Sequence, residues 1–107
     1  MTEVTFYCDA SGLYTGFDCN GHSGFAKAGK DIVCAGISVL TINFVNSVDE
    51  LTDAECDVVS DSKTGSMSVT IKDYNNDEIQ LLFKSLRLGL NAIQVEYPKY
   101  LKLTNRR

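Results

Sequence analysis

The 107-residue chain is 44% hydrophobic, has one proline and eight glycines, and carries a net charge of −4 from 14 acidic and 10 basic residues. This length leaves room for one hydrophobic core, so we expect a single domain over residues 1–107 and no disordered segment. The basic residues form no run longer than the terminal Arg106-Arg107 pair. That distribution argues against direct nucleic-acid binding, whereas a negative surface suits a basic protein partner.

Two features of the chain bear on its location. Glu3 stands where a secretory signal needs basic residues, and no apolar segment follows it, so we expect no export signal. Residues 32–48 are uncharged but slightly short for a bilayer, and they include several polar side chains. They therefore predict a buried helix and no membrane span. Without export, the four cysteines should be reduced in the cytoplasm, and their spacing matches no metal site.

The first half of the chain predicts a β-hairpin, a loop and a long helix. Apolar and polar residues alternate over residues 3–8 and 13–20, with turn-forming residues between them. Residues 21–30 contain three glycines and predict a mobile loop. Asp31 can cap a helix that continues to about Leu51. Because this helix is apolar nearly all round, we expect it to be buried between a sheet and a second helix or subunit.

The second half predicts another hairpin, a second helix and a last strand. Two strands are expected at residues 55–60 and 66–73. Apolar residues then recur with helical spacing from Asp77 until Pro98 ends the helix. Residues 100–104 alternate again and predict an edge strand. The resulting ββαββαβ order predicts an α+β fold of two layers, a mostly antiparallel sheet with two helices packed on it.

Cys34 and His22 are the candidates for chemistry. Cys34 lies three residues after the helix cap, where the first-turn amides and the positive end of the helix dipole favour a thiolate. His22, the only histidine, is carried by the preceding loop and could act as the general base of a Cys-His pair. The same spacing also fits a small core cysteine and a solvated histidine. Spacing alone leaves both interpretations open.

A longer motif carries more information than the pair. The string GHSGFAKAGKDIVCAGIS at residues 21–38 resembles the signature of the ribosomal-processing cysteine proteases (Prp), a glycine-histidine pair, a glycine-rich loop, then Asp-Ile-Val-Cys-Ala and a serine. The resemblance extends over essentially the whole chain, including the end of the second helix in Tyr-Pro-Lys-Tyr at residues 97–100. Ser23 stands where the family more often has alanine, and Gly36 where another small residue is usual. Neither change touches the Cys-His pair.

The resemblance implies an activity, a substrate and an assembly. Members of this family remove the N-terminal extension of large-subunit ribosomal protein number twenty-seven, cut after an aromatic residue, need no cofactor and act as homodimers. Transferred by the motif, His22 and Cys34 are the catalytic pair of a cysteine protease whose partner is a basic ribosomal protein. His22 would take the thiol proton and Cys34 would attack the scissile carbonyl, while amides at the start of the helix stabilise the oxyanion.

Other residues of the motif have supporting or substrate-binding roles. Asp31 fits either a helix cap or an orienting partner of the histidine. Ser38, one turn beyond the nucleophile, could bond near it or back to the carbonyl four residues earlier. Phe25 could contact the aromatic residue of the substrate or anchor the loop to the core. Three glycines predict a loop that orders when substrate binds, although a merely flexible surface loop also fits: Gly21, Gly24 and Gly29.

The remaining cysteines are expected to be structural. Cys8 and Cys19 lie on the first hairpin, but they should face residues 13–15 and 2–4, too far apart for a disulfide. Both are therefore expected in the core. Cys56 is expected to be a poor nucleophile because its thiol pKa should be raised by the acidic residues on either side, Glu55 and Asp57.

Two other functions stay open at this point. The chain could be a noncatalytic ribosome-assembly factor that binds a basic ribosomal protein through its acidic surface. It could also be a redox or metal protein that uses Cys34 and His22 with other thiols, although no two cysteines share metal-ligand spacing. Finally, the helix that begins after Asp31 lacks a solvated face, which predicts a two-fold dimer contact.

Overall fold

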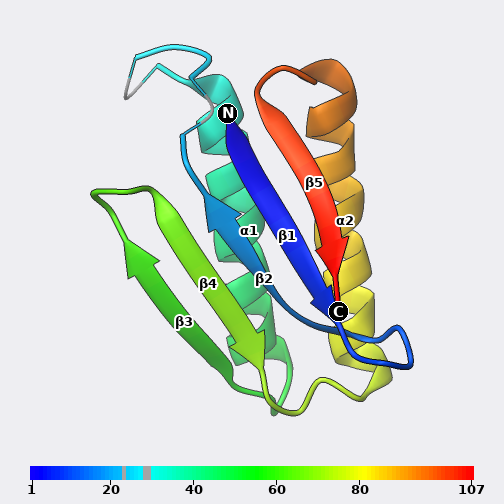
Figure 1. The fold of residues 1–107 in the computed structure, drawn as a ribbon. Helices are drawn as coiled ribbons and strands as arrows, with labels where there is room; N and C mark the ends of the chain where they lie inside the picture. Colours follow the sequence, from blue (N-terminus) through cyan, green and yellow to red (C-terminus); the bar gives the residue numbers. More distant parts are fainter. Residues whose placement is uncertain (23, 28–29) are drawn as a thin grey trace.

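The computed structural model describes residues 1–22, 24–27 and 30–107. Within these residues, two helices and five strands follow in the predicted ββαββαβ order (Figure 1). Every strand boundary lies within two residues of the predicted one. The elements are β1 (Thr2–Cys8), β2 (Tyr14–Asn20), α1 (Ile32–Leu51), β3 (Cys56–Asp61), β4 (Ser66–Ile71), α2 (Asp77–Glu96) and β5 (Leu101–Arg106).

The five strands form one sheet in the order β3-β4-β2-β1-β5. All neighbouring strands are antiparallel except β1 and β5, which are parallel. β5 is an edge strand, as predicted. In the β1–β2 hairpin Cys8 pairs with Tyr14 and Cys19 pairs with Val4, so the two cysteines lie well apart along the ladder. The predicted register of this hairpin is confirmed.

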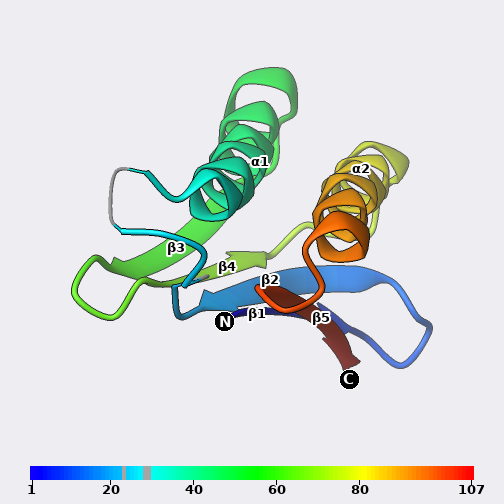
Figure 2. The same cartoon turned by 90° about the horizontal axis from the view of Figure 1, so that it is seen from above.

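Both helices cover the same face of the sheet, as Figure 2 shows. Alternation along β1 places Val4 and Phe6 in the core, each fully buried, and turns Thr5 and Tyr7 to the opposite face. On that face the Tyr7 hydroxyl donates to Asp18 Oδ2 over 2.6 Å, and this bond raises the pKa of Tyr7. The predicted two-layer α+β architecture is confirmed.

Aromatic rings connect the two layers. Phe17 of β2 contacts Phe44 of α1 edge to face, with ring centroids 5.5 Å apart, and Phe44 contacts Phe83 of α2 at 4.7 Å. All three rings are buried, and burial of such a side chain stabilises the fold by about 1.5–3 kcal/mol. The helices themselves approach closely at Gly36, where an added Cβ would lie 3.2 Å from Ile93 Cδ1. A small residue is therefore needed at this point of the α1–α2 contact.

The two faces of α1 differ in what covers them. Its buried residues recur every three or four positions and pack into the core: Val33, Ile37, Thr41, Phe44 and Val48. On the outer side Ile32, Val39 and Ile42 are 59%, 66% and 54% exposed. By length and composition alone α1 could cross a membrane, a property that core helices of soluble proteins share. The predicted contact with a sheet and a second helix is confirmed, and an exposed apolar stripe remains.

Candidate active site

The candidate active site is a cavity of about 480 Å³ beside the N-terminal end of α1. It brings together five of the seven residues that the sequence singled out, together with two alanines. Its lining is His22, Gly24, Ala26, Asp31, Cys34, Ala35 and Ser38. The loop between β2 and α1 supplies the first three and the first turns of α1 the last three, with Asp31 at the junction (Figure 1).

A second cavity of about 470 Å³ has a different lining. It lies where α1 ends and α2 begins, and its described residues include acids and amides but neither a thiol nor an imidazole: Thr52, Asp53, Ala54, Asp73, Asn76, Asp77 and Glu78. Nucleophilic chemistry of a Cys-His pair therefore belongs to the first cavity.

Asp31 uses both carboxylate oxygens at the start of α1. Its Oδ1 accepts a hydrogen bond from the Cys34 amide over 2.9 Å, and its Oδ2 accepts one from the Phe25 amide over 3.2 Å. The first of these bonds satisfies the Cys34 amide, which has no partner within the helix. The prediction that Asp31 caps the helix is confirmed, and the second bond ties the preceding loop to the same carboxylate. An orienting role toward His22 stays a prediction.

The cap narrows the choice of oxyanion donors. The Cys34 amide is bound by Asp31 Oδ1, and the Ala35 amide donates to the Asp31 carbonyl over 3.0 Å. Neither amide is therefore available to a developing oxyanion in this geometry. Of the first-turn amides of α1 that the sequence suggests as oxyanion donors, those of Ile32 and Val33 remain.

His22 packs against a turn that the sequence did not associate with the site. Gly65, in the turn between β3 and β4, has φ +68°, and an added Cβ would lie 2.8 Å from His22 Cε1 and 2.9 Å from Nε2. The backbone of this turn therefore forms one wall against the imidazole. The sequence predicted a turn here, but no local pattern indicates which distant side chain a turn contacts.

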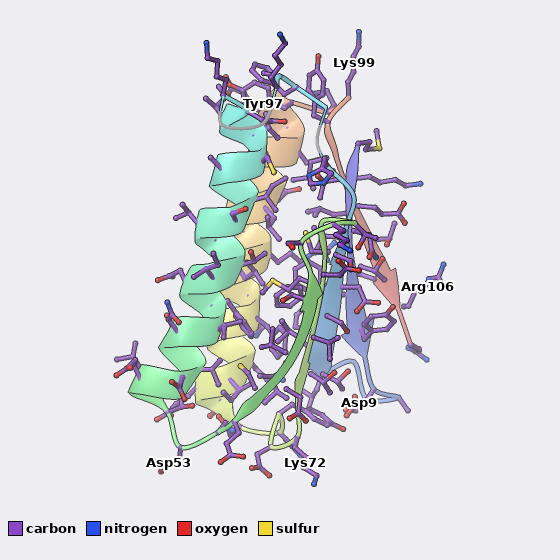
Figure 3. The ribbon with its side chains drawn as sticks, turned by 90° about the vertical axis from the view of Figure 1, so that its left-hand side faces the viewer. Asp9, Asp53, Lys72, Tyr97, Lys99 and Arg106 are labelled. Carbon is purple, nitrogen blue, oxygen red and sulfur yellow. The ribbon has the colours of Figure 1, made fainter. Side chains whose placement is uncertain are left out.

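Phe25 lies outside the cavity lining and packs on the connection between α2 and β5. Its ring meets Tyr97 edge to face with centroids 5.5 Å apart and meets Tyr100 in the same way at 5.2 Å. The ring contacts fit the anchoring role considered for Phe25, and a contact with the substrate stays a prediction. Figure 3 places Tyr97 at the end of the molecule where α1 begins, opposite Asp53.

The glycines and Ser38 have separate positions. Gly21 has φ +83°, and an added Cβ would lie 2.9 Å from the Met1 carbonyl oxygen, so the loop leaves β2 in close contact with the start of β1. Gly24 has φ +74° and lines the cavity, as does Ser38, one turn beyond Cys34. Gly29 and Ser23, which also belong to the motif, lie outside the described residues.

All four cysteines, each within the described residues, are free thiols. Cys19 is buried, and burial, with a smaller contribution from nearby Cys34, raises its thiol pKa to about 11. Burial also raises the pKa of Cys56 to about 11, followed by smaller effects of Asp49 and Asp57. The predicted direction for Cys56 is right, but the cause differs, because burial exceeds the acids and Asp49 acts in place of Glu55.

Cys8 is only half buried, so its expected place in the core is wrong. A bulge between Tyr7 and Cys8 shifts the ladder at the end of β1. Cys19 occupies the core as expected.

Comparison with known proteins gives one consistent result. The family model described as "Cysteine protease Prp" matches residues 1–102. The chain is 32% identical to the ribosomal processing cysteine protease Prp of Staphylococcus aureus over 103 residues, which cover 96% of this chain and 97% of that protein.

Two crystal structures of that Staphylococcus aureus protease share the fold. In complex with a covalently linked product peptide, it superposes with a TM-score of 0.94 at 31% identity, covering 98% of this chain and 99% of the other. In complex with a substrate peptide, the TM-score is 0.88 at 30% identity, with the same coverage.

Proposed function

The chain belongs to the Prp family of cysteine proteases, and from this we propose that it processes a ribosomal protein with Cys34 as nucleophile and His22 as general base. The observation that carries the proposal is that these two residues, twelve positions apart in the sequence, line one cavity at the N-terminal end of α1. A Cys-His acyl transfer needs a thiol and an imidazole that face the same space, and a shared cavity provides this. Residues 1–107 would form a single protease domain.

The proposed mechanism runs in two halves. His22 takes the thiol proton of Cys34, and the sulfur attacks the scissile carbonyl carbon to form a tetrahedral intermediate. The imidazolium then gives its proton to the leaving amine as the C–N bond breaks and an acyl-enzyme remains. A water molecule, deprotonated by His22, hydrolyses the thioester and restores both residues. In this mechanism the amides of Ile32 and Val33 donate hydrogen bonds to the oxyanion of the tetrahedral intermediate.

The proposed substrate is the N-terminal extension of large-subunit ribosomal protein number twenty-seven, cut after an aromatic residue. Support comes from the family resemblance and from the Staphylococcus aureus relative, which is named as a ribosomal processing protease. The net charge of −4 suits a basic substrate.

The test is mass spectrometry of a synthetic peptide of that extension, incubated with the wild type, Cys34→Ala and Cys8→Ala. Cys8→Ala is a matched control, because it removes a half-buried thiol that is not among the cavity residues. We expect one cut after an aromatic residue with the wild type and the control, and none with Cys34→Ala. Tight peptide binding by all three proteins without any cut would instead favour a noncatalytic assembly factor.

We also propose that the protease is a homodimer joined through the apolar stripe of α1 formed by Ile32, Val39 and Ile42, which are all more than half exposed. Light scattering at micromolar concentration should give the mass of a dimer for the wild type and of a monomer for Val39→Glu. Leu88→Glu, on an exposed position of α2, is the control and should remain dimeric. A monomeric wild type would end this proposal.

A cytoplasmic location is proposed from the four free thiols, which suit a reducing compartment. Cell fractionation that recovers the protein with a cytoplasmic marker is the expected result. Recovery with the membrane fraction would contradict the proposal and would indicate that α1, which is long and apolar enough to cross a membrane, binds one.

A further inference from the structure

The loop that carries His22 is held at one end by an aromatic cluster. Phe25 packs edge to face on Tyr97 and on Tyr100, with centroid distances of 5.5 and 5.2 Å. The edge-to-face arrangement directs the positive edge of one ring at the negative face of the other. The two tyrosines are themselves fixed by a turn in which the Tyr100 amide donates to the Tyr97 carbonyl over 3.0 Å.

The other end of the loop is attached to the same framework. The Thr2 hydroxyl donates to the Gly21 carbonyl over 3.4 Å, while the Thr2 amide donates to the Tyr100 carbonyl over 3.0 Å. Thr2, the first residue of β1, is only 2% exposed, so both bonds are made by a buried residue. His22 thus lies between two attachment points, at residues 21 and 25, that both lead to Tyr100, the first through Thr2 and the second through the ring of Phe25.

Phe25 also connects this framework to the nucleophile. Its amide donates to Asp31 Oδ2 over 3.2 Å, and Asp31 Oδ1 accepts the Cys34 amide over 2.9 Å. A continuous series of contacts therefore runs from the α2–β5 turn through the ring and backbone of Phe25 to the residue that bears the thiol. A displacement of Phe25 would act on both sides of the Cys-His pair.

We propose that Phe25, clamped by Tyr97 and Tyr100, is a positioning residue for the protease reaction that sets His22 against Cys34. The inference rests on the proposed roles of His22 and Cys34. Without the ring contacts, the loop would keep the bond at Gly21 and the Phe25 amide bond to Asp31 but lose its packing on Tyr97 and Tyr100. The imidazole would then sample positions remote from the thiol. Misplacement of a catalytic group by about 1 Å can lower the rate about a hundredfold.

The test separates positioning from simple stabilisation. Wild type, Phe25→Ala, Phe25→Leu and Phe25→Tyr are compared for kcat, KM, thermal unfolding and the pH dependence of Cys34 alkylation by iodoacetamide, followed by peptide mass mapping. Leu81→Ala, at a 67% exposed apolar position of α2, is the control. We expect Phe25→Ala and Phe25→Leu to lower kcat about tenfold while KM stays close to the wild-type value. The pH dependence of Cys34 alkylation in these two variants should move toward that of a thiol without a neighbouring base. Phe25→Tyr should keep both kcat and this pH dependence at their wild-type values.

A clamp also predicts coupling between its members. Tyr97→Ala should reproduce the kcat loss, and the Phe25→Ala/Tyr97→Ala double variant should be little worse than either single variant. An unchanged kcat and alkylation profile with lower thermal stability would reduce Phe25 to a structural anchor. A rise in KM alone would make it a substrate contact, and a rise in kcat/KM would make the clamp inhibitory; each result overturns the proposal. Activity that survives His22→Ala would instead refute the proposed Cys-His pair.

Discussion

The contact between Gly65 and His22 predicts that a larger residue at position 65 displaces the imidazole and lowers kcat. Gly65→Ala adds a Cβ that would lie 2.8 Å from His22 Cε1, whereas ordinary contact begins at 3.4 Å. The imidazole would therefore have to retreat by about 0.6 Å. Since a shift of about 1 Å can lower the rate about a hundredfold, we expect kcat to fall about tenfold or more. The positive φ of +68° adds about 1–2 kcal/mol of strain for an alanine.

Gly12 offers a matched control for the strain. It has φ +92°, and an added Cβ would meet nothing within 4 Å. It lies in the β1–β2 turn at the end of the molecule remote from the loop of His22 (Figure 1). Gly12→Ala should therefore lower the melting temperature to a similar degree as Gly65→Ala, by about 4–8 °C for each kcal/mol, without lowering kcat per folded molecule.

The assay combines thermal unfolding with peptide cleavage kinetics on the two alanine variants. A folded Gly65→Ala protein with wild-type kcat/KM would refute the argument that the β3–β4 turn holds the imidazole in its working position. Equal loss of activity in Gly65→Ala and Gly12→Ala would assign the effect to backbone strain.

Three further predictions concern stability and thiol reactivity. Buried Gln80 bonds three backbone groups of β2 and the β4–α2 loop, so Gln80→Ala should lower the urea-derived free energy of unfolding by about 2–4 kcal/mol and leave kcat per folded molecule unchanged. Hydrogen bonds, chiefly from the Ser11 hydroxyl and also from the Leu13 amide and the Tyr74 hydroxyl, lower the pKa of Asp9 to about 2 from 3.8. The stability that Asp9 contributes is therefore present above pH 3.8 and lost as the pH falls toward 2, and the stability difference between wild type and Asp9→Asn should shrink over this window. With pKa values of about 11, Cys19 and Cys56 should resist iodoacetamide at pH 7.5, and peptide mass mapping should find these two the last of the four cysteines to be alkylated.

Local patterns in the sequence are sufficient to predict the helices and strands. The alternation of apolar and polar residues predicts each strand boundary to within two residues. Asp31 is identifiable as a cap because its carboxylate precedes an apolar segment with helical spacing. The hairpin register followed from the short turn, which is why the separation of Cys8 and Cys19 was predicted. β5 continues to Arg106, beyond the predicted end, because its parallel pairing with β1 extends to the Tyr7–Arg106 pair. That pairing is not visible in the pattern of β5 alone.

The parts of the site that the sequence left open depend on contacts between distant segments. Periodicity assigns a residue to a face but does not identify the neighbour that meets it. The contact of Gly65 with His22 spans 43 positions, and that of Phe25 with Tyr97 spans 72. The second bond of Asp31 to the Phe25 amide likewise depends on how the loop folds back on the helix. The sequence is therefore compatible with both alternatives for Phe25, and the structure adds the contacts of its ring with Tyr97 and Tyr100.

The central claim is that Cys34 carries the acyl group of the substrate, and intact mass spectrometry after rapid acid quenching tests it most directly. The substrate peptide is mixed with the wild type and with Cys34→Ala, quenched during turnover, and the adduct is located by peptide mapping. We predict an adduct on Cys34 with the mass of the N-terminal product less one water, and no adduct on Cys34→Ala. An adduct on another residue, or turnover that Cys34→Ala sustains at the wild-type rate, would contradict the assignment of Cys34 as the nucleophile.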